Sequence, residues 1–163
     1  MGMGGARRFT VDAYEEAFER DGSLRDLYVL STSRDDWSAF LKFVSASQYA
    51  NRFKLNDSPA PLPPDASSLF PRSGDNFPLL RIDVSGMGLN CHFYLENEIE
   101  LDLDPREVQD DAKADAIVAF IAALGDALGK EVRMTSENGP DEAILRYDPS
   151  AKNVSYVPPP HRV

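Results

Sequence analysis

Residues Glu98 to Asp104 read Glu-Ile-Glu-Leu-Asp-Leu-Asp, an unbroken alternation of carboxylate and aliphatic side chains. Successive side chains of a β-strand point to opposite faces of a sheet, so this period of two predicts a strand with one apolar and one acidic face. The apolar face has to be covered by other elements, whereas the acidic face is expected to lie toward solvent. The alternation therefore favours an antiparallel sheet that helices cover on one side.

The rest of the chain supplies further strands and the helices that cover them. Apolar residues at helical spacing predict a short helix over 10–20, a helix that begins at Ser33, and a longer helix that follows Asp104 and ends at Gly129. Strands are predicted at 27–30, 49–55, 79–85, 89–95, 99–103, 132–135 and 143–147. The predicted fold is α+β: a two-layer sandwich, mostly antiparallel, with a central three-strand meander at 79–103 and helices packed on one face.

The 163 residues are expected to form a single domain that covers 1–163. Residues 1–9 are predicted to be a disordered N-terminus, and 149–163 an extended C-terminal tail. Five prolines interrupt the segment 56–77, which predicts a long loop. We interpret this loop as packed across a sheet edge or a helix by its apolar side chains. The alternative is a lid, or an arm that docks a partner.

The formal charge of −10 is concentrated in one part of the chain. Residues 1–55 carry eight basic and eight acidic side chains, whereas 96–115 carry nine acidic and two basic ones, a net charge of −7. Such a surface repels a phosphate backbone and attracts a cationic partner, so nucleic-acid binding is not expected. The single cysteine favours a cytoplasmic location, and no apolar run reaches the ~20 residues that span a membrane.

The alternation also predicts which polar side chains are neighbours. A two-residue loop at Gly86-Met87 and a three-residue loop after Leu95 pair the apolar residues of the three strands with one another. The polar residues Arg81, His92 and Asp102 then form one row across the meander. This row is either a group of cross-strand ion pairs that stabilises the sheet, or an acid–base site beneath the proline-containing loop.

Other candidates for chemistry are weaker. The chain has no dinucleotide, phosphate-loop or zinc-binding motif, so we expect no cofactor and no metal. Glu98, Glu100 and Asp102 are candidates to hold a hard cation, but strand carboxylates two residues apart are separated by ~7 Å along the backbone, so a solvated acidic face is the favoured interpretation. Asp104 is assigned as a helix cap. Cys91 alternates with apolar residues and is predicted to be a core residue.

Together, these observations predict a non-catalytic protein-binding module whose partner-binding residues are Glu98, Glu100 and Asp102. The expected partner is a basic protein, because a fixed acidic surface steers a cationic molecule toward it. In size and charge alone the chain resembles immunity proteins that neutralise bacterial toxins. The alternatives are a small enzyme or ligand-binding domain with its site at Arg81, His92 and Asp102, and a homodimer that pairs two polar sheet faces.

Overall fold

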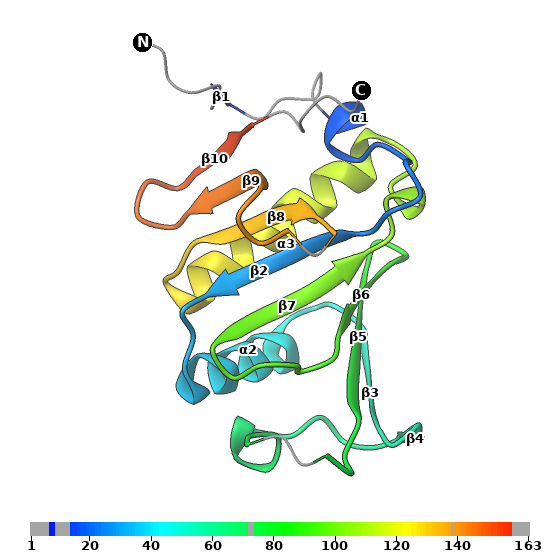
Figure 1. Cartoon of the computed structure of the whole chain (residues 1–163), viewed down its shortest axis with the longest axis vertical. Coiled ribbons are helices and arrows are strands. Elements are labelled where there is room, and N and C mark those ends of the chain that lie inside the picture. Colours follow the sequence, from blue (N-terminus) through cyan, green and yellow to red (C-terminus); the bar gives the residue numbers. More distant parts are fainter. Residues whose placement is uncertain (1–6, 9–13, 72–73, 138, 158–163) are drawn as a thin grey trace.

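The computed structural model describes residues 7–8, 14–71, 74–137 and 139–157. Within these ranges the strands form one antiparallel sheet of ten strands, and two longer helices lie against it (Figure 1). The predicted class of a mixed α+β protein with a mostly antiparallel sheet is confirmed.

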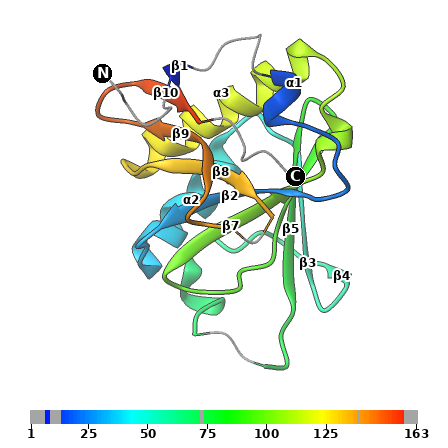
Figure 2. The same ribbon diagram turned by 45° about the horizontal axis from the view of Figure 1, so that its top comes forward.

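The strands are β1 (Arg7–Arg8), β2 (Arg25–Leu30), β3 (Asn51–Leu55), β4 (Ser58–Pro59), β5 (Pro78–Val84), β6 (Met87–Cys91), β7 (Glu98–Leu103), β8 (Val132–Ser136), β9 (Ala143–Asp148) and β10 (Asn153–Tyr156). Their order across the sheet is β1-β10-β9-β8-β2-β7-β6-β5-β3-β4. Strand β2 is thus in the interior of the sheet, and β10 adds part of the predicted tail to it. In Figures 1 and 2, β5 and β3 run steeply across the direction of β2 and β7, so the sheet twists strongly between its two halves.

The helices are α1 (Tyr14–Ala17), α2 (Arg34–Ala46) and α3 (Asp111–Leu128), with short 3₁₀ turns η2 (Ala66–Ser68) and η3 (Pro105–Glu107). The predicted capping box is present, because the Ser33 side chain accepts from the N–H of Asp36 and the Asp36 side chain accepts from the N–H of Ser33. Asp104 caps η3 as predicted, and Asp110 caps α3. Gly129, with φ 64°, ends α3 in the left-handed conformation.

Helices α2 and α3 pack against each other and lie on the same face of the sheet, which we call the inner face (Figure 1). Trp37 of α2 is at the centre of an aromatic group, with ring centroids 5.0 Å from Phe70 and 5.1 Å from Phe93. The strands contribute alternate residues to this core: Leu27, Val29, Leu80, Ile82, Leu89, Cys91, Leu101 and Leu103. The intervening residues of these strands are on the opposite side, which we call the outer face.

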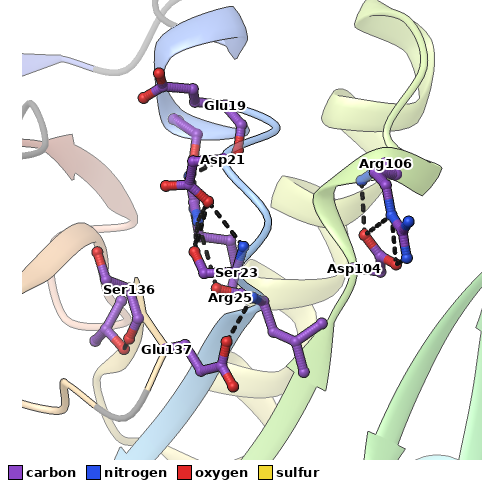
Figure 3. Close-up of polar contacts among 11 residues, drawn as sticks. Glu19, Asp21, Ser23, Arg25, Asp104, Arg106, Ser136 and Glu137 are labelled. Atoms are coloured by element: carbon purple, nitrogen blue, oxygen red, sulfur yellow. Dashed lines mark hydrogen bonds and ion pairs between the residues drawn. The ribbon is translucent and has the colours of Figure 1, made fainter.

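Arg25, the first residue of β2, is buried and holds the segment that precedes the strand (Figure 3). Its Nε donates to the carbonyl oxygen of Ala17 at 2.9 Å, and its Nη2 donates to the carbonyl oxygen of Glu19 at 3.1 Å. Its Nη1 donates to Ser23 Oγ at 3.2 Å and lies 3.6 Å from the carboxylate of Asp21. A buried guanidinium needs such partners, so Arg25 has a structural role in fixing the turn between α1 and β2.

The proline-containing loop contains β4, the edge strand of the sheet, and packs against β3 and α2. The main-chain N–H of Ala60 donates to the carbonyl oxygen of Phe53 at 3.1 Å, and the prolines on either side of Ala60 have no N–H. Further along, Ala66 is buried and its N–H donates to Ser38 Oγ of α2 at 3.0 Å. The described part of segment 56–77 is therefore an ordered cover over these two elements.

The hairpin between β5 and β6 is two residues out of the predicted register. Its loop is Ser85-Gly86 instead of Gly86-Met87, and both loop residues have positive φ, 53° and 86°. This conformation gives a two-residue turn whose twist suits a hairpin. A shift of two residues keeps every side chain on its predicted face. It changes the polar neighbour of Arg81, however, from His92 to Asn90.

Candidate functional site

The acidic alternation of the sequence forms β7, which lies between β2 and β6. The predicted division of its two faces is confirmed. The inner-face residues are at most 1% exposed: Ile99, Leu101 and Leu103. The outer-face residues are half-buried rather than freely exposed: Glu98, Glu100 and Asp102. The strand therefore presents its carboxylates on a partly enclosed surface.

Two residues of β2 complete this surface and were not predicted from the sequence. Strands β2 and β7 pair antiparallel, which places Asp26 opposite Asp102 and Tyr28 opposite Glu100. Both β2 residues are buried, Asp26 at 2% and Tyr28 at 3% exposure. Asp26 and Tyr28 alternate with the aliphatic residues Leu27 and Val29, which is the sequence pattern that could have identified them. The predicted strand at 27–30 was based on a continuous apolar run, which does not take this alternation into account. Four carboxylates thus gather on two neighbouring strands, and we call Asp26, Glu98, Glu100 and Asp102 the acidic patch.

Burial and repulsion make the charged form of Glu100 unfavourable in the folded chain. Burial raises the pKa of Glu100, and the charges of Asp26, Glu98 and Asp102 raise it further, while a hydrogen bond from Tyr28 lowers it. Burial and the neighbouring carboxylates raise the pKa of the Tyr28 hydroxyl well above its usual range, so it remains a donor. Among the described residues, no lysine or arginine is within ion-pair distance of Glu98 or Glu100.

The predicted row of Arg81, His92 and Asp102 is wrong in its central member. Asn90 is the register partner of Arg81 on one side and of Asp102 on the other. The Asn90 Nδ2 donates to Asp102 Oδ1 at 3.0 Å. His92 still reaches the same carboxylate, with 3.7 Å between its Nε2 and Asp102 Oδ2. Asn90 therefore takes the position between Arg81 and Asp102 that was predicted for His92.

An extra residue between β6 and β7 explains this difference. Leu95 bridges to Glu98 across a two-residue loop, instead of the predicted three-residue loop. The β6 side of the hairpin has one residue more than the β7 side, and the left-handed Phe93, with φ 56°, accommodates it. Phe93 is buried in the core. The rings of His92 and Tyr94 stack at 5.1 Å, with 13° between their planes.

The proline-containing loop does not cover this site. Its buried residues pack against α2 on the inner side of the sheet, as the hydrogen bond from Ala66 to Ser38 shows. His92 and Asp102 are on the outer face, and their side chains are 38% and 22% exposed. The described part of segment 56–77 therefore does not form the predicted alternative, a lid over these residues.

The titratable groups at this site are carboxylates, the His92 imidazole and the Tyr28 phenol. Cys91 is fully buried as predicted, and burial raises the pKa of its thiol to about 12, so no thiolate nucleophile is present. Within the described residues, no group of three or more His, Cys, Asp or Glu side chains is placed to hold a metal ion. The carboxylates of Glu98, Glu100 and Asp102 are half-buried on the outer face of β7, whereas that of Asp26 on β2 is buried.

Comparisons with known proteins give no family for this chain. No family model matches it, and neither a curated protein nor a solved structure is significantly similar to it. In the part of the chain that the structure describes, no helix is long and apolar enough to cross a membrane. The function therefore has to be inferred from the geometry and charge of the outer face.

Proposed function

We propose that this protein is a non-catalytic binding module whose acidic patch engages a cationic segment of a partner protein. In this proposal the protein is a two-layer sandwich: α2 and α3 form one layer, and the sheet with its central meander of β5, β6 and β7 forms the other. The helices occupy the inner face, so the outer face is the surface for the partner. Its role is that of an inhibitor or immunity protein toward a basic target.

One observation carries the proposal: Glu98 and Glu100 are half-buried beside two further carboxylates and have no cation of the described residues to pair with. The raised pKa of Glu100 means that its charged form lowers the stability of the folded chain. A lysine or arginine from a partner would relieve this repulsion. The fold therefore carries an electrostatic cost that a cationic partner removes, which is a common arrangement in functional surfaces.

The alternative of an acid–base site at Arg81, His92 and Asp102 has less support. Asn90 takes the position between Arg81 and Asp102, and the loop that was expected to enclose the site packs on the other side of the sheet. What supports it is the pair of His92 with Asp102, at 3.7 Å. Ion pairs of this kind are common at protein surfaces without any catalytic role.

The proposal predicts that neutralising the acidic patch abolishes partner binding and leaves the fold intact. The test variant carries Glu98→Gln, Glu100→Gln and Asp102→Asn together. Exposed or half-exposed charge changes alter stability by only about 0.5 kcal/mol each, so the variant should fold. Wild type and variant are used to capture proteins from an extract of the source cells at low and at high salt. A partner held by the acidic patch is retained by wild type at low salt and is lost as salt rises.

A matched control changes the net charge equally at other sites: Asp35→Asn, Asp57→Asn and Asp111→Asn, all at exposed carboxylates away from β2 and β7. The proposal requires a partner that wild type and control both retain and the patch variant does not. Equal capture by all three proteins would contradict it, and so would partners whose retention does not change with salt.

A further inference from the structure

Two arginines face each other directly across the β3–β5 pair, and both are exposed. Arg52 of β3 is the register partner of Arg81 of β5. Like charges directly opposite each other in a sheet destabilise it. Neither guanidinium makes an ion pair or a hydrogen bond with any residue that the structure describes. In a chain with a net charge of −10, this local excess of positive charge is unusual.

The same sheet contains a second arginine pair, which shows how the chain neutralises such an arrangement. Arg133 of β8 is the register partner of Arg146 of β9. Glu131 lies between them, with its carboxylate 2.7 Å from Arg133 Nη2 and 3.6 Å from Arg146 Nη1. One internal carboxylate therefore serves both guanidinium groups. The Arg52–Arg81 pair has the same cross-strand geometry but no such carboxylate.

The Arg52–Arg81 pair borders a surface recess of about 250 Å³. The other residues that line it are Ala50, Asn51 and Asp83. The Asp83 carboxylate is engaged in the neighbouring turn, where its Oδ1 accepts from the N–H of Gly86 at 2.8 Å. Lys54 is two residues from Arg52 on β3 and so points to the same face. Two guanidinium groups and one carboxylate line the recess and give it a net charge of +1, and the carboxylate of Glu107 lies nearby, where it accepts from the N–H of Gly88 at 2.8 Å.

The position of Arg81 depends on a glycine. Its guanidinium lies across the main chain of Gly88 on β6, where any Cβ would collide with it. This contact with β6 limits the freedom of the long Arg81 side chain, which also lines the recess. Such preorganisation reduces the entropy that a ligand would otherwise lose on binding.

We propose that the Arg52–Arg81 pair is a binding site for a dianionic phosphate group. Guanidinium groups bind phosphate oxygens through paired hydrogen bonds, and two of them match the two charges of a phosphate monoester. This site is two strands away from the acidic patch and does not depend on the proposed binding of a cationic partner.

The test is calorimetric titration of the full chain with inorganic phosphate at about pH 7.5, where most of the phosphate is dianionic. Saturable binding of one phosphate per chain is expected. Arg52→Gln or Arg81→Gln should weaken it by roughly tenfold to a hundredfold, since each removes charge-assisted hydrogen bonds. Gly88→Ala, which keeps the charge but displaces Arg81, should also weaken it. The matched control Arg146→Gln removes an exposed arginine that Glu131 already neutralises, and should leave phosphate binding unchanged.

Each variant is first melted, so that loss of binding is scored only for folded protein. Because all three site variants act on different residues, failure of one to fold leaves the other two decisive. Absence of saturable binding to wild type would overturn the proposal, as would equal weakening in Arg146→Gln or equal affinity for acetate. A phosphoserine peptide and a sugar phosphate, titrated in parallel, then distinguish the source: the one that binds more tightly than inorganic phosphate carries the group in the natural ligand.

Discussion

The two faces of β7 differ in how far folding alone explains them. On the inner face, Ile99, Leu101 and Leu103 are buried in one continuous apolar core with the helices. On the outer face of the same sheet, charges of both signs follow one another across the strands. Arg52 and Arg81 lie on β3 and β5, Asp102 and Asp26 on β7 and β2, and Arg133 and Arg146 on β8 and β9. The inner face of β7 is uniform because its three side chains meet the same requirement, which is removal from water.

The outer face is not uniform, and parts of it work against folding. Carboxylates are opposite or next to one another on β2 and β7, and two arginines are opposite each other on β3 and β5. Stability would favour opposite charges at these cross-strand positions. Natural proteins tolerate such arrangements mainly where binding requires them. The inner-face residues of β7 thus specify the fold, whereas part of the charge on the outer face opposes it.

The largest effect is expected from an inner-face substitution. Leu101→Ala should lower the free energy of unfolding by about 2–5 kcal/mol, because it removes buried methyl groups and leaves a cavity. Urea denaturation of wild type and variant measures the difference. Asp102→Asn, the adjacent residue on the outer face, is the matched control and should change stability by no more than about 0.5 kcal/mol. If Asp102→Asn were the more damaging of the two, the assignment of faces in β7 would be inverted.

A smaller and opposite effect is expected from Glu100→Gln, which should stabilise the protein at neutral pH by about 0.5 kcal/mol. The pKa of Glu100 is raised in the folded state above its ordinary value of 4.5. The folded chain therefore binds this proton more tightly than the unfolded chain, and stability falls as pH rises from 4.5 through the raised pKa. Glutamine removes that loss and still accepts the hydrogen bond from Tyr28. Denaturation at a series of pH values should show the two proteins converging below about pH 4.5. A difference that persists unchanged in acid would show that repulsion is not its cause.

The smallest change in stability, but a new binding property, is expected from Glu131→Gln. This substitution removes the carboxylate that neutralises Arg133 and Arg146, while surface ion pairs contribute only about 0–1 kcal/mol to stability. The variant should thus contain two unneutralised arginine pairs and bind two phosphates per chain in the calorimetric titration. A stoichiometry that remains at one would mean that cross-strand arginines alone do not make a phosphate site, and that the recess beside Arg81 is required.

The sequence predicted the elements that depend on local patterns. The two faces of β7, the capping box at Ser33 and the end of α3 at Gly129 all depend on residues close together in the chain. The registers of the two hairpins were not predicted correctly from the sequence. Apolar alternation cannot distinguish a register from one shifted by two residues, because both keep the same faces. The alternation also does not predict the extra residue at Phe93. Phenylalanine has no preference for the left-handed backbone conformation that is found there.

Contacts between strands that are distant in sequence were not predicted at all. Strand β2 inserts between β7 and β8, which brings Asp26 to Asp102 across more than seventy residues. The pairing of Arg52 with Arg81 likewise depends on β3 lying beside β5. Local patterns assign side chains to faces but do not determine which strands are neighbours. Both charged surfaces of the outer face arise from such neighbours, which explains why the sequence indicated only the β7 half of one of them.

The loop that packs along β3 also has a consequence for how this protein behaves in a crowded solution. An uncovered edge strand is a template on which other chains can polymerise through main-chain hydrogen bonds. Here the carbonyl oxygen of Phe53 is already occupied by Ala60, and the prolines beside Ala60 have no N–H to offer an incoming strand. The part of β3 from Phe53 to Leu55 is therefore covered by the segment 58–60 of the same chain, and the two prolines beside Ala60 disfavour the addition of a further strand.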